Sequence, residues 1–493
     1  MKMFKELRTY FVLFLIGTVG WFTYQMITYP ILPGKYLAIV LLALYLVSIL
    51  LGLSQYKGNL FVNILGKIGI IILSAALFFV NFTYLKTVDL FDDIVQTEDT
   101  DVVSVVVKDK SGYRHIEDLD NKTVGILSTK DTYVDQTYEG LTINLEKKTY
   151  EGVEDLVNAL MKGEIDSIII NESYRGIYEE INPEFTNDTR VIYSKEYQTV
   201  IEPEKDPETD KDEDKDQDVI VEPVPGDKFK EETVNNNINV TQDTFSIYVS
   251  GIDTYGSIST KSRSDVNMIV TVNPREHRIL LTSIPRDYRV PFNVLRGASD
   301  KLTHSGLYGV NETKGNVQRY FGVSIPYYVR VNFTSLVTIV DALGGITINN
   351  PWEGVFDLPV GEAHLDGKMA LVYARERMAF GGNGGDNVRI QNQARVITGI
   401  INKACSPEII TNYSNLLGAL RGSFQTNLSD SQILSLIRMQ LGDMRGWSIE
   451  TQSVSGTAGY FYSPIYGYSK KLYMVVPNKD SVERARDRIA SMY

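Results

Sequence analysis

Three apolar runs without a single charged residue stand near the N-terminus, at residues 9–29, 36–56 and 68–85. At a rise of about 1.5 Å per residue, each run is long enough as a helix to cross a hydrocarbon core of about 30 Å. Aromatic residues lie near the ends of the runs, as expected for anchoring at a membrane–water interface. The sequence therefore predicts a membrane region over residues 1–86 that contains three transmembrane helices.

Charges around these runs predict their orientation. Basic residues precede the first run, and acidic residues follow the third at positions 89, 92, 93, 98, 99 and 101. Because positive charge favours the cytoplasmic side, we expect a cytoplasmic N-terminus. Everything after about residue 86 is then extracellular, in a multi-pass protein of the cell membrane. A cleaved signal peptide fits poorly, because two more apolar runs follow closely.

Composition narrows the class of protein. The single cysteine, Cys405, excludes an intramolecular disulfide, which for an exported chain suggests a bacterial exterior. The net charge of −12 argues against a nucleic-acid partner. The chain has only four histidines, and none stands in a nucleophile–base motif. Hydrolytic triads and zinc sites are therefore poorly supported.

A strongly acidic segment divides the exported part. Residues 202–218 hold ten acidic side chains against three lysines, and a proline-containing stretch follows. Such a segment buries too little apolar surface to fold, so we interpret residues 201–240 as a solvated linker. Before it, strands at 102–107, 123–127 and 166–170 alternate with helices at 151–161 and 172–181. This pattern predicts a small α/β accessory domain over residues 98–200.

After the linker, residues 241–493 predict one larger domain. Strand signals fall at 245–250, 266–272, 279–284, 327–332 and 346–349, and helical signals at 336–343, 388–404, 429–441 and 481–490. Interleaved strands and helices indicate an α/β fold, here an α-β-α sandwich around a central mixed sheet. Sheets of this kind present ligand sites beyond the ends of their strands.

Arginines and aspartates gather where these apolar runs end. The arginines are Arg263, Arg286, Arg375, Arg377 and Arg389. The guanidinium is a planar fork of donors that matches phosphate, and two such charges about 4 Å apart repel by about 4 kcal/mol near a surface. Converging arginines would therefore need anions among them. Aspartates can supply some of this charge, and a bound pyrophosphate the rest.

Two of the aspartates suggest a metal site. Asp253 and Asp265 each flank a predicted strand, with no histidine or cysteine nearby. Such a pair suits an oxygen-seeking ion such as Mg²⁺. Salt bridging is the alternative, with Asp265 answering Arg263 or Arg286.

The remaining candidates depend on local conformation. Arg375 and Arg377 face the same way only if their segment is extended; on a helix they diverge, with Glu376 as a structural partner. Arg389 and Gln393 share one face near the start of a predicted helix, where anions are favoured. Asp386 has a plain alternative role as the N-cap of that helix. We expect residues 381–385, rich in glycine, to form a loop beside the site. His304 is expected either to line the site or to make a structural hydrogen bond.

The chain resembles the LytR–CpsA–Psr family of cell-wall enzymes in segments that read, in order, GID, SRSD, SIPRD, KLTHS, VDALGG, LDGKMALVYARER and GDNVRIQNQ. The match is strong over about residues 241–405. Its membrane topology and accessory domain resemble the streptococcal capsule-type members. The resemblance implies phosphotransfer of a capsular or teichoic-acid-like polymer from a polyprenyl-pyrophosphate carrier to peptidoglycan. It also implies a Mg²⁺ cofactor, which Mn²⁺ can replace, and partners in the membrane lipid and among capsule-assembly proteins.

By this resemblance, Asp253 and Asp265 match the metal-linked aspartates. The pyrophosphate binders match Arg286, Arg375, Arg377, Arg389 and Gln393, together with Arg263. The residues expected to act in catalysis are Asp265, Arg286, Arg375 and Asp386, and either aspartate is a candidate to accept the proton. Two other functions stay open. One is a membrane-anchored receptor or regulator that binds lipid-linked polymer without turnover, and the other is a polyprenyl-pyrophosphate lipid pyrophosphatase.

Overall fold

The structure is a computed structural model that describes residues 2–28, 34–57, 59–91, 98–128, 131–200, 238–353, 356–377, 385–407, 416, 418–419 and 422–493. Most of the predicted linker, residues 201–237, lies outside these ranges, and so do residues 381–384 of the predicted glycine-rich loop. The chain folds into two compact units. One is Met1–Val95, Cys405–Arg421 and Ser429–Gly446, and the other is Gln96–Ala404, Gly422–Leu428 and Trp447–Tyr493.

The first unit contains three long apolar helices and α13 (Asp430–Asp443). The long helices are α1 (Lys2–Thr28), α2 (Gly34–Lys57) and α3 (Leu60–Phe91). Each is long and apolar enough to cross a membrane, over Arg8–Thr28, Gly34–Tyr56 and Leu60–Phe82. The prediction of three such helices is confirmed. The third begins earlier than residue 68, so Lys67 lies inside it. The apolar residues at 60–62 and 64–65 continue the helical run, which a single lysine does not end.

The accessory domain is built on a five-stranded sheet with the order β3-β2-β4-β1-β5. Its strands are β1 (Glu98–Lys108), β2 (Lys122–Leu127), β3 (Leu145–Tyr150), β4 (Ser167–Asn171) and β5 (Thr189–Val200). Its helices are α4 (Thr132–Glu139), α5 (Val153–Lys162), α6 (Arg175–Ile181) and α7 (Phe185–Asp188). Helix α5 buries Leu156 and Leu160 on one face, because apolar residues recur at helical spacing. It ends at Gly163, whose φ of 76° is the left-handed conformation that glycine adopts without strain.

The larger domain is built on a six-stranded mixed sheet with the order β14-β11-β6-β7-β8-β15. The strands are β6 (Phe245–Ile252), β7 (Ser264–Asn273), β8 (Arg278–Ile284), β11 (Tyr327–Val331), β14 (Gln425–Thr426) and β15 (Ser448–Ser453). Strand β7 runs antiparallel to both β6 and β8, whereas β11 is parallel to β6 and β15 is parallel to β8. The predicted mixed sheet is therefore confirmed.

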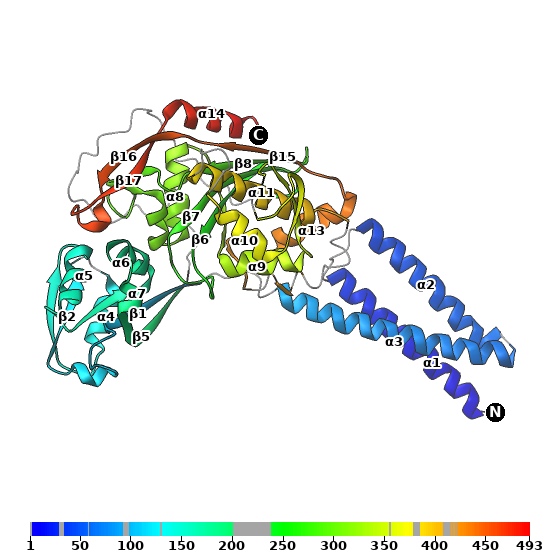
Figure 1. Ribbon diagram of the computed structural model, residues 1–493. Helices are drawn as coiled ribbons and strands as arrows, with labels where there is room; N and C mark the ends of the chain where they lie inside the picture. Colours follow the sequence, from blue (N-terminus) through cyan, green and yellow to red (C-terminus); the bar gives the residue numbers. More distant parts are fainter. Residues whose placement is uncertain are drawn as a thin grey trace, which may run out of the picture. The chain divides into compact units, whose positions relative to one another are not determined.

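Helices cover this sheet. Strands β7 and β8 are almost continuously buried, so both faces of the sheet are covered. The helices are α8 (Val310–Phe321), α9 (Phe333–Ala342), α10 (Gly367–Arg375), α11 (Asp386–Ala404) and α14 (Lys479–Ala490). Two short helices, η3 (Leu302–Tyr308) before α8 and η4 (Pro464–Tyr466) between β16 and β17, accompany them. Helix α10 packs between α9 and α11, α11 packs on β8, and α14 packs on α8 (Figure 1). Shorter hairpins are β9 (Arg289–Pro291) with β10 (Ser299–Lys301), β12 (Ile346–Asn350) with β13 (Gly361–Leu365), and β16 (Gly456–Tyr462) with β17 (Lys471–Pro477).

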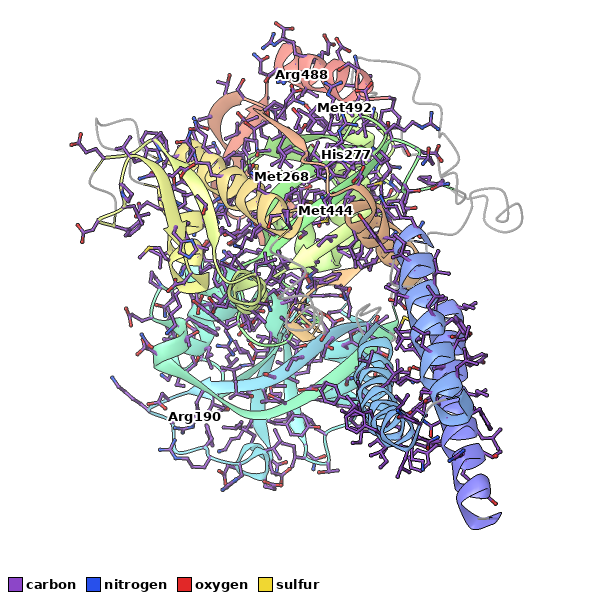
Figure 2. The ribbon with its side chains drawn as sticks, turned by 90° about the vertical axis from the view of Figure 1, so that its right-hand side faces the viewer. Arg190, Met268, His277, Met444, Arg488 and Met492 are labelled. Atoms are coloured by element: carbon purple, nitrogen blue, oxygen red, sulfur yellow. The ribbon has the colours of Figure 1, made fainter. Side chains whose placement is uncertain are left out.

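The accessory domain and the larger domain share one apolar core. A continuous cluster of buried side chains includes Leu156 and Phe185 from the accessory domain and Phe292 and Phe321 from the larger domain. Met492, which follows α14, belongs to the same cluster (Figure 2). The acidic linker separates the two domains in sequence, but buried side chains of both belong to one cluster.

Candidate active site

The topology of the central sheet brings three candidate residues together at one end of its strands. Asp253 directly follows β6, Asp265 is the second residue of β7, and Arg286 follows β8 after Pro285. Because β7 is antiparallel to both β6 and β8, the end of β6, the start of β7 and the end of β8 lie next to one another at the same end of the sheet. This arrangement explains how residues distant in sequence form a single site.

Asp265 is the centre of the site. Its Oδ2 atom accepts a hydrogen bond from Arg286 Nη1 at 2.6 Å, and Arg389 Nη1 lies 3.8 Å from the same oxygen. Its Oδ1 atom accepts from Thr303 Oγ1 at 2.9 Å. Burial by itself raises the pKa of the Asp265 carboxyl, but Arg286, Arg263 and Arg389 outweigh it and hold that pKa below its usual range. Asp265 is therefore ionised and held between arginines.

Arg389 carries a buried and incompletely neutralised charge. It lies on the first turn of α11 with a side chain only 6% exposed, and its Nη2 atom is 2.6 Å from Asp386 Oδ1. Its pKa is lowered, first by burial and then by the positive charges of Arg286 and Arg377. Among the described residues, the buried Nε atoms of Arg286 and Arg389 have no hydrogen-bond partner. A bound anion would relieve both the repulsion and the unmet donors.

Arg263 forms a second ion pair at the same end of the sheet. Its Nη2 atom donates to Asp253 Oδ2 at 2.8 Å, and Ser262 Oγ donates to Asp253 Oδ1 at 3.1 Å. Short helix η3 supports this segment, because Gly306 packs on the backbone of residues 262–264. A Cβ at Gly306 would lie 2.4 Å from the Ser262 carbonyl oxygen, so only glycine permits this approach.

The structure gives Arg375 and Arg377 different environments. Arg375 is the last residue of α10, and its guanidinium lies over the Phe333 ring at 4.7 Å. Arg377 lies beyond the helix, close enough to Arg389 to lower the pKa of that arginine. Glu376 stands between them and accepts a hydrogen bond from the Arg377 backbone N–H at 2.8 Å. Gln393 is half-buried on α11, one turn beyond Arg389.

Thr303 contacts the candidate residue Asp265, although the sequence alone did not indicate it. The sequence instead indicated the neighbouring His304 as a candidate to line the site. The His304 side chain is fully buried, and its Nδ1 atom lies 3.1 Å from Asp300 Oδ1. The structure therefore shows His304 in a hydrogen bond inside the protein, and its neighbour Thr303 reaches Asp265. The signal available in the sequence was the position of Thr303 directly before His304 at the start of η3. Successive side chains there point in different directions, so the two neighbours contact different parts of the protein.

The donor atoms fit a hard cation only in part. The described residues hold no cluster of three or more carboxylate, histidine or cysteine side chains that could bind a metal by themselves. Asp253 and Asp265 nevertheless offer carboxylate oxygens beside the hydroxyls of Ser262 and Thr303. Mg²⁺ commonly takes one or two carboxylates and completes its shell with water and substrate phosphates. Oxygen donors of this kind fit such an ion when a phosphate is also bound.

Comparison with known proteins now places the chain in a family. The LytR_cpsA_psr family model matches residues 204–489, more than half of the chain, and the chain belongs to this family. It is 34% identical over 209 residues to the Enterococcus faecalis protein named polyisoprenyl-teichoic acid–peptidoglycan teichoic acid transferase TagU, covering 41% of this chain and 67% of that protein. The protein of the same name from Bacillus subtilis is 34% identical over 207 residues, covering 41% and 66%. The chain thus spans about two thirds of the length of these relatives.

Solved structures are also similar. The crystal structure of Bacillus subtilis TagU has 27% sequence identity and a TM-score of 0.39, covering 51% of this chain and 97% of that chain. The structure of TagT bound to LI-WTA has 25% identity and a TM-score of 0.42, covering 52% and 94%.

Proposed function

We propose that the protein is a transferase that moves a glycopolymer from a polyprenyl-pyrophosphate carrier to a hydroxyl of peptidoglycan and releases polyprenyl phosphate. The observation that carries this proposal is the pair formed by the buried Arg389 and the half-buried Arg286, which converge on one carboxylate oxygen at 3.8 Å and 2.6 Å. Family membership supports the same reaction, because relatives at 34% identity are named teichoic acid transferases. The polymer proposed is a phosphate-linked glycopolymer of the capsular or teichoic-acid kind.

The site chemistry is stabilisation of phosphate charge. The acceptor hydroxyl attacks the phosphorus on the polymer side, forming a new P–O bond. The bond from that phosphorus to the bridging oxygen breaks, and the electron pair leaves on polyprenyl phosphate. Arg286 and Arg389 would neutralise the oxygens on which charge develops, and this electrostatic contribution is commonly the largest in catalysis. Arg377 and Arg263 flank the same position, and Gln393 and Arg375 complete the proposed substrate contacts.

Asp386 is the better candidate to accept the hydroxyl proton. Asp265 receives hydrogen bonds from both Arg286 and Thr303, and its lowered pKa makes it a weak base. Asp386 pairs with Arg389 and keeps a more exposed side chain, at 28% against 16% for Asp265. We therefore propose that Asp386 takes the proton while Asp265 orients the arginines.

Mg²⁺ is part of the proposal. Asp253 and Asp265 would hold the ion, which would supply further positive charge to the pyrophosphate. The three apolar helices are long and apolar enough to anchor the protein in a membrane. We propose that the N-terminus is cytoplasmic and that the site lies outside the cell membrane, where lipid-linked pyrophosphates are presented.

Turnover by the purified full-length protein tests the function. The protein in detergent is incubated with Mg²⁺, a short polyprenyl-pyrophosphate-linked oligosaccharide and peptidoglycan fragments. Sugar phosphate joined to the fragments, with polyprenyl phosphate released in equal amount, supports the transferase. Polyprenyl phosphate released without any acceptor indicates a lipid pyrophosphatase. Tight binding of the lipid with no product indicates a receptor, and either of these results overturns the proposal.

Replacing Asp265 with asparagine should lower turnover about tenfold, since the neutral amide no longer balances the arginines or holds a cation. The variant also tests whether the pKa of the Asp265 carboxyl is lowered in the folded protein. A carboxyl whose folded pKa is depressed stabilises the folded state above its unfolded pKa, and this contribution disappears as pH falls through the folded value. The gap in melting temperature between wild type and Asp265→Asn is therefore expected at pH 7 and should close below pH 3.8, the ordinary value.

Asp135→Asn is the control for this variant. Asp135 lies in a surface pair with Lys147 and is 46% exposed, so both turnover and melting temperature should stay near the wild-type values. A gap for Asp265→Asn that persists at low pH would show that lost packing, and not lost charge, explains the effect.

A further inference from the structure

The β6–β7 loop, residues 253–263, carries a candidate site residue at each end. Asp253 begins the loop and Arg263 ends it, directly before β7. The two side chains meet in an ion pair at 2.8 Å. The position of this loop therefore decides where the Asp253 carboxylate and the Arg263 guanidinium stand relative to Asp265.

The first strand of the accessory domain pairs with the middle of this loop. The Thr100 backbone N–H donates to the Ser259 carbonyl oxygen at 2.8 Å, and the Lys261 N–H donates back to the Thr100 carbonyl at 3.4 Å. The hydroxyls of Thr100 and Ser259 also lie 2.9 Å apart. The loop thus pairs with β1 as a short strand would, through a parallel bridge between Thr100 and Thr260.

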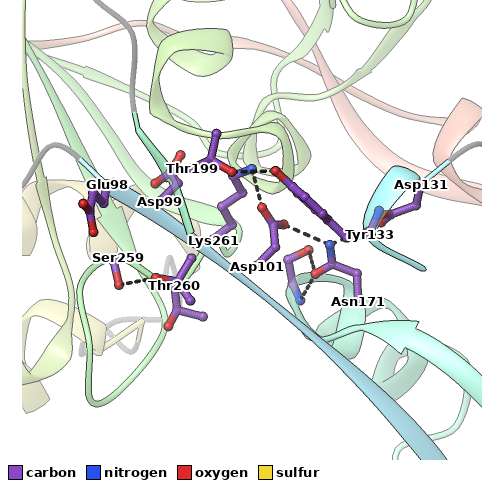
Figure 3. A network of polar contacts seen from close by, with 12 residues as sticks. Glu98, Asp99, Asp101, Asp131, Tyr133, Asn171, Thr199, Ser259, Thr260 and Lys261 are labelled. Carbon is purple, nitrogen blue, oxygen red and sulfur yellow. Dashed lines mark hydrogen bonds and ion pairs between the residues drawn. The ribbon is translucent and has the colours of Figure 1, made fainter. Parts of the chain in front are cut away.

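Buried charges reinforce this pairing. Asp101 Oδ2 lies 2.7 Å from Lys261 Nζ, with side chains only 4% and 16% exposed (Figure 3). Asp99 Oδ1 lies 2.7 Å from Nη1 of Arg330, whose Nη2 donates to the Thr260 carbonyl oxygen. Two carboxylates from β1 therefore fix the residues that immediately precede Arg263.

Helix α6 of the accessory domain then holds Arg263 itself. Glu180 Oε1 accepts from Arg263 Nη1 at 2.9 Å, while Nη2 of the same guanidinium is bonded to Asp253. Gly176 stands one turn before Glu180 on the same helix face. A Cβ on Gly176 would lie 2.9 Å from Arg263 Cζ, so the helix backbone packs directly on the guanidinium. Arg263 is enclosed by Gly176, Glu180 and Asp253.

The larger domain holds Glu180 from its other side. The Tyr466 hydroxyl donates to Glu180 Oε2 at 2.8 Å, and Lys470 Nζ donates to the Glu180 carbonyl oxygen at 3.2 Å. Burial raises the pKa of Tyr466 first, and the Glu180 carboxylate raises it further. Burial alone would raise the pKa of Glu180, but Tyr466 and the nearby positive charges keep it low and the carboxylate ionised.

We propose that α6 of the accessory domain completes the active site, with Glu180 and Gly176 as positioning residues that hold the Arg263 guanidinium on Asp253. The inference rests on the proposed function for the reaction that these residues serve. An arginine side chain loses much rotamer freedom when it is fixed, and two carboxylates on separate edges of the guanidinium supply the bonds that fix it. Without Glu180, Arg263 can leave Asp253, and the charges around the pyrophosphate are no longer set before substrate binds.

A matched pair of variants on α6 tests this proposal. Glu180→Gln keeps the size of the side chain and removes the charge that binds Arg263. Glu179→Gln makes the same change at the preceding residue, whose carboxylate accepts a hydrogen bond from Thr186 inside the accessory domain. In the full-length protein, Glu180→Gln is expected to lower kcat about tenfold, below the roughly hundredfold loss that a 1 Å misplacement of a reacting group can cause, because Asp253 still contacts Arg263. Glu179→Gln should stay within about twofold of wild type, because Glu179 is only half-buried and its carboxylate bonds to Thr186, away from Arg263.

Gly176→Ala separates positioning from folding. Alanine favours a helix more than glycine does, so the melting temperature should not fall. The added methyl group meets the Arg263 guanidinium, which must move, so kcat should fall in the same direction as in Glu180→Gln. Wild-type kcat in Gly176→Ala and in Glu180→Gln would overturn the proposal.

A double-variant comparison shows whether Glu180 acts through Arg263. Arg263→Ala alone should lower kcat, and adding Glu180→Gln to it should cause no further loss, because the group that Glu180 positions is gone. Additive losses would mean that Glu180 acts by another route, and the proposal would be wrong.

Hydrogen exchange gives a readout that does not depend on activity. Backbone amides of residues 253–263 should exchange faster in Glu180→Gln than in wild type, and should be unchanged in Glu179→Gln. An unchanged loop in Glu180→Gln would overturn the positioning role even in an active enzyme. A wild-type protein without transferase activity would instead overturn the proposed function, and the exchange result would still decide whether α6 holds the loop.

Discussion

Arg286→Lys is expected to lower turnover about a hundredfold, nearly as much as Arg286→Ala. Removing one preorganised donor from a catalytic site commonly costs about 10²–10³ in kcat. Arg286 uses one edge of its guanidinium on Asp265 and leaves its Nε without a partner among the described residues. A lysine ammonium can reach Asp265 or a substrate phosphate but cannot present two parallel donors to either. The charge is kept in this variant, and the fork is lost.

Arg278→Lys provides a matched control for this prediction. Arg278 begins strand β8, the strand that ends just before Arg286, and it pairs at the surface with Glu276 and Glu450. The same substitution there should leave turnover near the wild-type value, and both variants should melt within a few degrees of wild type by differential scanning fluorimetry. Near wild-type kcat/KM for Arg286→Lys would show that Arg286 acts as a point charge only.

Asp99→Asn is expected to lower the free energy of unfolding by about 3–5 kcal/mol, the usual result of removing one member of a buried ion pair. Asp99 and Arg330 are 2.7 Å apart, with side chains only 9% and 2% exposed. Burial already lowers the pKa of Arg330 despite the carboxylate beside it. An asparagine would keep an acceptor oxygen but remove the charge, which leaves the buried guanidinium facing this amide oxygen, the Gln425 side chain and the Thr260 carbonyl oxygen, all of them neutral.

Asp109→Asn is the control for the stability change. Asp109 lies in the same domain and pairs with Arg190, but its side chain is 55% exposed, so the loss should be less than about 1 kcal/mol. Chemical denaturation of the detergent-solubilised protein measures both variants. Removing both charges, with Asp99→Asn and Arg330→Gln together, should recover part of the loss. Equal stability of Asp99→Asn and Asp109→Asn would show that the Arg330 site admits water.

Elements with apolar periodicity could be predicted well from the sequence. The predicted strand at 279–284 corresponds to β8 (Arg278–Ile284), and the predicted helix at 388–404 corresponds to α11 (Asp386–Ala404). Polar strands gave no such signal. Strand β3 reads LEKKTY and is largely exposed, so its strand pairing with β2, and not its own composition, determines its conformation.

The residues of the candidate site also fall into two groups, those that could be predicted from the sequence and those that could not. Asp265 lies at the start of β7 and Arg286 follows the end of the antiparallel strand β8, so their proximity follows once the strand order is known. Glu180 could not have been found by such reasoning. It lies 83 residues before Arg263, beyond the acidic linker, in a helix whose sequence carries no phosphate or metal motif. Its role depends on tertiary contacts between domains, which neither periodicity nor spacing encodes.

The ion pair between Asp99 and Arg330 also has a consequence for biosynthesis. Asp99 meets Arg330, 231 residues later, and Gln425, 326 residues later. At roughly 5–20 residues per second, a ribosome needs on the order of a minute or less to make the intervening chain. During that interval the accessory sheet can form, but the start of β1 has none of these partners. The acidic side chains at positions 98, 99 and 101 keep that stretch soluble and discourage strand-to-strand aggregation while it waits. Two of these carboxylates, on Asp99 and Asp101, therefore have two roles: they favour solubility of the nascent chain and later pair with Arg330 and Lys261 of the larger domain.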